Sequence, residues 1–239
     1  MRNIEPVQSH LKILGGSGNF FTEGEVFANP DLNRLQGLGL ETVSTLKSAL
    51  TKIGVVDDKN SYCLSAVMVV KDMTAVEGMS NYTAAFCTNA YKVKAIKLNS
   101  SLKERKVGGF IALNRKLLDI NNDASMLRDG YIVSHRAQGA VAHEVGHAVM
   151  NIFNNLAARS RSDISVNKNI VNAYHSYYKD TQKLPAISIY GATNVLESFA
   201  ESFSAYVCNM PRTGPSQKRF ETFMTQAGMS SLKGILKIR

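Results

Sequence analysis

The chain has 239 residues, of which 44% are hydrophobic and 20% are charged. This balance is typical of a folded globular protein and excludes a mainly disordered one. Its 28 lysines and arginines exceed its 19 aspartates and glutamates, which gives a net charge of +9. Because the basic residues are spread along the chain, with a modest cluster between residues 92 and 106, they indicate a solvated basic face rather than a nucleic-acid site.

Cysteine usage and the first residues of the chain predict where the protein is made. Cys63, Cys87 and Cys208 are too few and too scattered for a disulfide framework, so we expect reduced thiols. Glu5 and Pro6 stand where a signal peptide would have its apolar segment, and no run of eighteen apolar residues appears. The sequence therefore predicts no membrane span and synthesis in a cytoplasm, with a phage-associated or injected protein as an open setting.

The first predicted element is helical. Asn29 and Pro30 predict a helix start, with asparagine as the cap and proline in the first turn. Apolar residues then recur at helical spacing. We expect Gly37 and Gly39 to divide this segment into two helices, because glycine destabilises a helix interior, and Gly54 to end the second.

Strands precede helices in the rest of the chain. Three apolar or loosely alternating segments predict strands, at 62–70, within 81–98 and at 108–113. The later pattern predicts four helices, at about 134–158, 164–181, 194–209 and 216–227. Strands followed by helices are typical of an α+β domain.

The helix predicted at 134–158 contains the HExxH sequence from His143 to His147. Two histidines four residues apart lie on one face of a helix, so both imidazoles can reach a single ion. Zinc accepts neutral imidazole and tolerates an open position for water. Glu144 lies about a third of a turn from His143, where it can contact that water as a general base without being a ligand. The alternative is that the histidines are core residues bonded to backbone carbonyls.

A catalytic zinc normally has a third protein ligand, and Glu197 and Glu201 are the acidic candidates. They lie four residues apart and so share one face of the helix predicted at 194–209 with Ser204. Carboxylates that face a protein interior need a cation or hydrogen-bond donors to compensate them. Two carboxylates on a solvated helix face are the alternative.

HExxH followed by YGATNVLESFAESF at residues 190–203 resembles the gluzincin metallopeptidases. Within that group the pattern is most similar to the catalytic domain of anthrax toxin lethal factor and to the Pro-Pro endopeptidases. The resemblance covers residues 130–210 and reaches the preceding strands only in outline. It implies a zincin-like α+β catalytic domain over 60–239, with a small mixed sheet, an active-site helix and C-terminal helices. A small helical N-terminal unit over 1–59 would precede this domain.

Carried over to this sequence, the resemblance implies that three side chains bind zinc: His143, His147 and Glu197. Glu144 would be the general base, and Tyr190 would donate a hydrogen bond to the developing oxyanion. Glu201 would hydrogen-bond a ligand histidine and fix its tautomer. An exchange of roles between Glu197 and Glu201 is the alternative.

The leading hypothesis is a zinc endopeptidase that acts on proteins or peptides. Its substrate would run antiparallel to an edge strand of the sheet, for which Val107 to Leu113 is the candidate. The second hypothesis is a binding or structural protein, such as a phage or effector component, that keeps the zincin scaffold and a structural zinc. A third, a basic nucleic-acid-binding protein, predicts strongly salt-dependent affinity for DNA or RNA, and no motif supports it.

Overall fold

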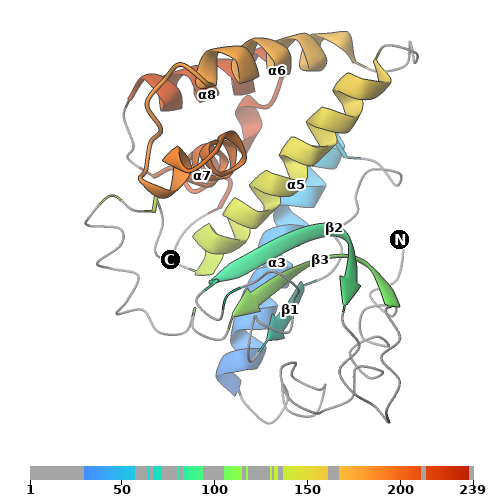
Figure 1. Cartoon of the computed structure of the whole chain (residues 1–239). Helices are drawn as coiled ribbons and strands as arrows, with labels where there is room; N and C mark the ends of the chain where they lie inside the picture. Colours follow the sequence, from blue (N-terminus) through green and yellow to red (C-terminus); the bar gives the residue numbers. More distant parts are fainter. Residues whose placement is uncertain are drawn as a thin grey trace.

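The computed structural model describes a helix-rich chain with one small sheet (Figure 1). The described residues are 30–56, 64, 67–70, 80, 83–93, 105–114, 117, 130, 132–133, 137–160, 167–210 and 214–236. In chain order, the elements are α3 (Pro30–Lys52), β1 (Val67–Val70), β2 (Ala85–Val93), β3 (Arg105–Asn114), α5 (Ala137–Arg159), α6 (Lys168–Thr181), η4 (Tyr190–Ala192), α7 (Val195–Val207), α8 (Pro215–Gln226) and η5 (Ser230–Leu232). Strands thus precede the helices α5 to α8, as the sequence predicts. Parts of four predicted segments lie outside the described residues: 62–63 and 65–66 of the first strand, 81–82 and 94–98 of the next strand segment, and 134–136 and 164–166 of two helices.

The three strands form a mixed sheet in the order β1-β3-β2. β1 runs parallel to β3, with Val67 opposite Ile111, and β2 runs antiparallel to it, with Ala85 opposite Leu113. β3 is therefore the central strand, and the prediction that Val107–Leu113 forms an edge is wrong. Nearness to α5 in the sequence does not fix strand order, whereas full burial of the run from Ile111 to Leu113 is typical of a central strand.

The segment after Pro30 forms one helix, α3, rather than the two predicted. A Cβ atom at Gly39 would lie 2.8 Å from Val67 Cγ1 and 2.9 Å from Leu113 Cδ1. Gly39 therefore allows the helix to lie close against the sheet, and packing there outweighs the weak helix propensity of glycine. Gly54 ends the helix as predicted, because it adopts a φ of 74° that favours glycine.

Helix α5 lies at the centre of the fold. In Figure 1 it runs between the sheet and the group formed by α6, α7 and α8. It contacts β2, β3 and α3 as well as α6 and α7. Val141, Val145, Ala148 and Ile152 form an apolar stripe at helical spacing and are buried, but the face that carries His143 is buried too. α5 is therefore enclosed on two sides, and its polar face points to another helix instead of solvent.

A set of aromatic rings holds the C-terminal helices together. The Phe153 ring of α5 packs edge-to-face on Phe223 of α8, with ring centroids 5.5 Å apart. Tyr177 of α6 stacks on the same Phe223 at 5.0 Å, and Phe199 of α7 lies 5.3 Å from Phe220. These contacts are buried and continuous with the core that includes α3 and the sheet. They fix the position of α7 relative to α5.

Two further predictions concern chain-wide properties. Cys87 and Cys208 form no disulfide, as predicted, while Cys63 lies outside the described residues. Within the part of the chain that the structure describes, none of the helices has the length and apolar character needed to cross a bilayer.

Candidate metal centre

The two helices that carry the predicted ligands cross at Gly146, inside HExxH. A Cβ atom at this position would lie 2.9 Å from Ala200 Cα and 3.2 Å from Phe203 Cβ, both on α7. Only glycine allows so close an approach. The crossing turns the Glu197 and Glu201 face of α7 towards the histidine face of α5.

Asn194 fixes where α7 begins. Its side-chain Oδ1 accepts hydrogen bonds from the backbone N–H groups of Leu196, at 2.9 Å, and Glu197, at 3.0 Å. This is an asparagine N-cap. Since the cap sets the helix start, it places Glu197 in the first turn and Glu201 one turn later on the same face.

Three donor atoms converge at this crossing: His143 Nε2, His147 Nε2 and Glu197 Oε2. His143 Nε2 lies 2.9 Å from Glu197 Oε2 and 3.1 Å from His147 Nε2, and His147 Nε2 lies 3.2 Å from Glu197 Oε2. Ligands of a tetrahedral zinc, about 2.0–2.1 Å from the ion, stand about 3.3–3.4 Å apart. The three atoms therefore have the chemistry and nearly the spacing of one face of a zinc site.

The donor set also needs positive charge. Glu201 accepts a hydrogen bond from His143 Nδ1 at 2.9 Å. In a neutral His143 with its proton on Nδ1, the Nε2 lone pair faces Glu197 Oε2, which is an acceptor, and His147 Nε2, which is also an acceptor when that ring carries its proton on Nδ1. Such an arrangement is repulsive unless a cation or a proton lies between the atoms.

The pKa values of the cluster reflect the same demand. Burial lowers the pKa of His143, but hydrogen bonds to Glu197 and Glu201 outweigh it and raise the pKa to about 10. Burial raises the pKa of Glu197, but hydrogen bonds from His143 and His147 outweigh it and lower the pKa to about 2. The cluster thus favours a positive charge at the point where the three donor atoms meet.

Glu201 lies behind the cluster, at 3% exposure. Besides His143 Nδ1, it accepts hydrogen bonds at Oε2 from Val133 N, at 2.9 Å, and from Ser188 Oγ, at 2.7 Å. Its bond to His143 is on the ring nitrogen that points away from the cluster, whereas Glu197 contacts Nε2 of both histidines. This geometry favours the predicted roles of Glu197 and Glu201 over their exchange. Burial of Glu201 also rules out a solvated helix face, and the carboxylate partners of His143 rule out its pairing with backbone carbonyls alone.

Glu144 lies between α5 and the edge strand β2. It is 7% exposed, and burial raises its pKa. The charges of His143 and His147 oppose this rise, as does a hydrogen bond from the backbone N–H of Cys87 in β2. The candidate general base is therefore held against β2, the outer strand of the sheet that the described strands form, beside the two histidines.

Tyr190 lies beside the cluster in the short helix η4. Its ring centroid is 5.7 Å from that of His143, and the side chain is half-buried. The Thr193 hydroxyl donates to the Tyr190 carbonyl at 2.7 Å, which stabilises the turn that carries the tyrosine. All six predicted site residues are thus gathered around one point: His143, Glu144, His147, Tyr190, Glu197 and Glu201.

Sequence reasoning missed three neighbours of the site: Val133, Ser188 and Cys87. Val133 and Cys87 act through backbone N–H groups, which every residue type except proline supplies, so no sequence signal marks them. Ser188 lies two residues before Tyr190, in a segment without periodicity. The only sequence signal that could have identified it is its position two residues before the motif at 190–203 that carries the family resemblance.

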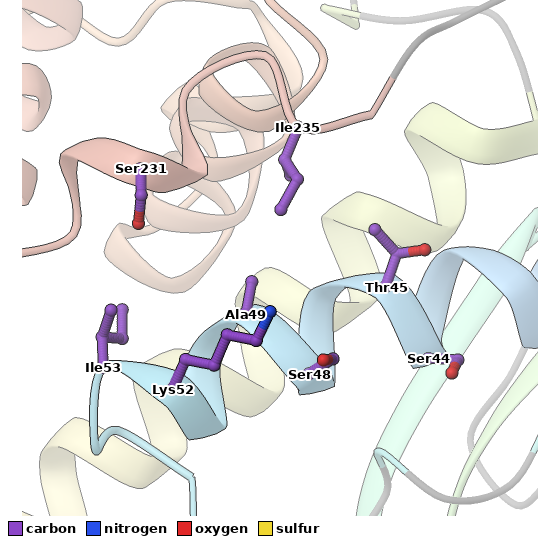
Figure 2. Close-up of a pocket in the computed structure, with 8 residues that line it drawn as sticks. All are labelled: Ser44, Thr45, Ser48, Ala49, Lys52, Ile53, Ser231 and Ile235. Carbon is purple, nitrogen blue, oxygen red and sulfur yellow. The ribbon is translucent and has the colours of Figure 1, made fainter.

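A separate cleft of about 530 Å³ lies between α3 and the C-terminal segment. Figure 2 shows Ser231 and Ile235 on one side, facing residues of α3 on the other. Its lining combines hydroxyls with apolar groups and one lysine: Ser44, Thr45, Ser48, Ala49, Lys52, Ile53, Ser231 and Ile235. The cleft shares no residue with the histidine–glutamate cluster.

No family is identified by comparison. No protein-family model, curated protein or solved structure gives a significant match to the chain. The residues of the cluster and their geometry are therefore the basis for assigning a function.

Proposed function

We propose that the protein is a zinc-dependent endopeptidase of the gluzincin type, with a zincin-like catalytic fold. One observation carries the proposal. The Nε2 atoms of both HExxH histidines and one carboxylate oxygen of Glu197 lie within 3.2 Å of one another. A buried carboxylate orients His143 from behind, as metal-binding histidines usually require.

The ligand residues are His143, His147 and Glu197. A zinc ion held there would supply Lewis acidity for the hydrolysis of a peptide bond near neutral pH. Glu144 accepts the proton of the attacking water and delivers it to the leaving amine. Burial favours this role, because it raises the pKa of Glu144 and makes the carboxylate a stronger base. The Tyr190 hydroxyl donates a hydrogen bond to the developing oxyanion.

The free edge of β2 is the proposed docking strand for the substrate. No described strand pairs with β2 on the side opposite β3. Asn114 N donates to Ala84 O, so the backbone groups of Ala84 face β3 and, by strand alternation, those of Ala85 and Cys87 face away from β3. The hydrogen bond from Cys87 N to Glu144 agrees with this orientation. A peptide added to this edge would pass directly beside the general base.

The test is the cleavage of a diverse peptide library by wild type and by Glu144→Gln, both loaded with zinc. The substitution keeps the shape of the side chain but removes its ability to take a proton. We expect cleavage to fall by about 10²–10⁴-fold while zinc binding persists. Glu221→Gln is the matched control, because Glu221 lies on the surface of α8 in an ion pair with Lys233. It should cleave as wild type does.

Two outcomes would count against the proposal. Full activity of Glu144→Gln would contradict the mechanism. Zinc binding without cleavage by wild type would favour the non-catalytic scaffold that the sequence leaves as the alternative.

A further inference from the structure

The Ser188 side chain connects two parts of the candidate site that belong to different helices: the turn that carries Tyr190 and the Glu201 carboxylate. Its hydroxyl donates to Glu201 Oε2 at 2.7 Å and accepts from the backbone N–H of Gly191 at 2.9 Å. The side chain is buried, with 7% exposure. Gly191 belongs to η4, the turn that carries Tyr190, whereas Glu201 lies on α7.

A further hydrogen bond links Glu201 to His143, a member of the histidine–glutamate cluster. The other oxygen of this carboxylate, Oε1, accepts from His143 Nδ1 at 2.9 Å. One chain of bonds therefore runs from Gly191 N–H through the Ser188 hydroxyl and the Glu201 carboxylate to the imidazole of His143. A serine hydroxyl can occupy the middle of such a chain because it donates and accepts at once.

Packing leaves the turn little room to move relative to Glu201. A Cβ atom at Gly191 would lie 3.0 Å from Ser188 Oγ and 3.5 Å from Glu201 Cβ. The backbone next to Ser188 is held as well, since Ile189 N donates to Gly130 O at 3.0 Å. A change at the Ser188 hydroxyl must therefore be felt at Glu201.

We propose that Ser188 is a positioning residue, which orients His143 for metal binding through Glu201 and holds the Tyr190 turn against the same carboxylate. This inference rests on the proposed zinc site and extends that site to a residue outside the motif at 190–203 that carries the family resemblance. Loss of the hydroxyl leaves Gly191 N–H without its acceptor and removes one of three donors from Glu201.

The experiment measures the zinc affinity of the full chain by competition with a chelator of known affinity. Ser188→Ala should bind zinc about tenfold more weakly than wild type, the lower end of what the loss of an outer partner causes. Ser188→Cys, which nearly preserves the side-chain volume but hydrogen-bonds weakly, should show a similar loss without creating a cavity. This second variant keeps the test sharp if the alanine variant folds poorly.

Ser204→Ala is the matched control. Ser204 is buried on α7, and its hydroxyl also donates a hydrogen bond, to Gly139 O at 2.9 Å instead of to Glu201. Its zinc affinity should stay within about twofold of wild type, the small change expected of a site outside the bonded chain. A loss of affinity equal to that of Ser188→Ala would mean that any buried serine has this effect and would overturn the inference.

A double-mutant cycle tests the route. If Ser188 acts through Glu201, Ser188→Ala should weaken zinc binding less in a Glu201→Gln background than in wild type. Full additivity of the two losses would overturn the inference, as would wild-type affinity in both Ser188 variants. Absence of zinc binding by wild type would instead overturn the proposed function, and this inference with it.

Discussion

Gly146→Ala tests whether the close crossing of α5 and α7 builds the site. The added Cβ would lie 2.9 Å from Ala200 Cα, 3.2 Å from Phe203 Cβ and 3.3 Å from Ala200 O. Two of these three atoms are backbone, which cannot rotate away as the end of a long side chain can. The helices must therefore separate by a few tenths of an ångström, and the ligands on α5 and α7 must separate with them.

Two opposing effects set the magnitude. Alanine in place of glycine favours a helix interior by about 1 kcal/mol. Overpacking of a filled core costs about 1–3 kcal/mol, and contact with fixed backbone atoms puts Gly146 at the upper end. We therefore expect Gly146→Ala to lower the free energy of unfolding by about 1–2 kcal/mol, the difference between these two effects.

Urea unfolding of both this variant and Gly37→Ala provides the assay and its control. A Cβ atom at Gly37 in α3 would meet no atom within 4 Å, so only the helix propensity should change. Gly37→Ala should raise the free energy of unfolding by about 0.5–1 kcal/mol. If Gly146→Ala were as stable as Gly37→Ala and bound zinc like wild type, the close crossing would not be a requirement of the site.

Two further predictions concern buried polar groups. Glu201 now accepts hydrogen bonds from three donors, and Glu201→Gln leaves only one amide oxygen to accept them. The variant should therefore lose about 1–3 kcal/mol of stability in urea unfolding and bind zinc about 10–100-fold more weakly in a zinc titration. Wild-type values for both would contradict the three-donor arrangement. Burial raises the pKa of Tyr177 to about 12, above its ordinary value of 10 in the unfolded chain, so its contribution to stability is complete below pH 10 and is lost as the pH rises towards 12. When the pH is raised from 8 to about 11.5, the free energy of unfolding of wild type should fall by about 2 kcal/mol more than that of Tyr177→Phe, as measured by urea unfolding. Equal decreases in the two proteins would refute the raised pKa of Tyr177.

The sequence predicts the helices of the site better than the sheet. Apolar spacing marks α5 and α7 within a few residues, because both helices carry a strong apolar stripe. It does not reveal that the opposite face of α5 is also buried, since that depends on how α7 packs. The prediction of two helices in place of α3 is wrong because the sequence does not distinguish a glycine that breaks a helix from one, such as Gly39, that allows a strand to pack closely against it. The central position of β3 depends on pairing between distant segments, which no local pattern encodes.

The candidate site also has a part that the sequence predicts and a part that it does not. Spacing alone brings His143 and His147 to one helix face, and Glu197 and Glu201 to another. The hydrogen bonds that orient them come from Ser188, from Val133 N and from Cys87 N, in segments without periodicity. The candidate ligands can therefore be predicted from the sequence, whereas the donors that orient them are identified only once the fold is known.

The central claim is that His143, His147 and Glu197 together form one zinc site. Its most direct test is the zinc content per chain of wild type, His147→Ala and His175→Ala after equilibration with zinc and removal of the excess. His175 is an exposed histidine of α6 and serves as the control. We predict about one zinc per chain in wild type and His175→Ala and almost none in His147→Ala, since a site of three protein ligands is lost with one of them. Wild type without zinc, or His147→Ala with as much zinc as wild type, would contradict the account.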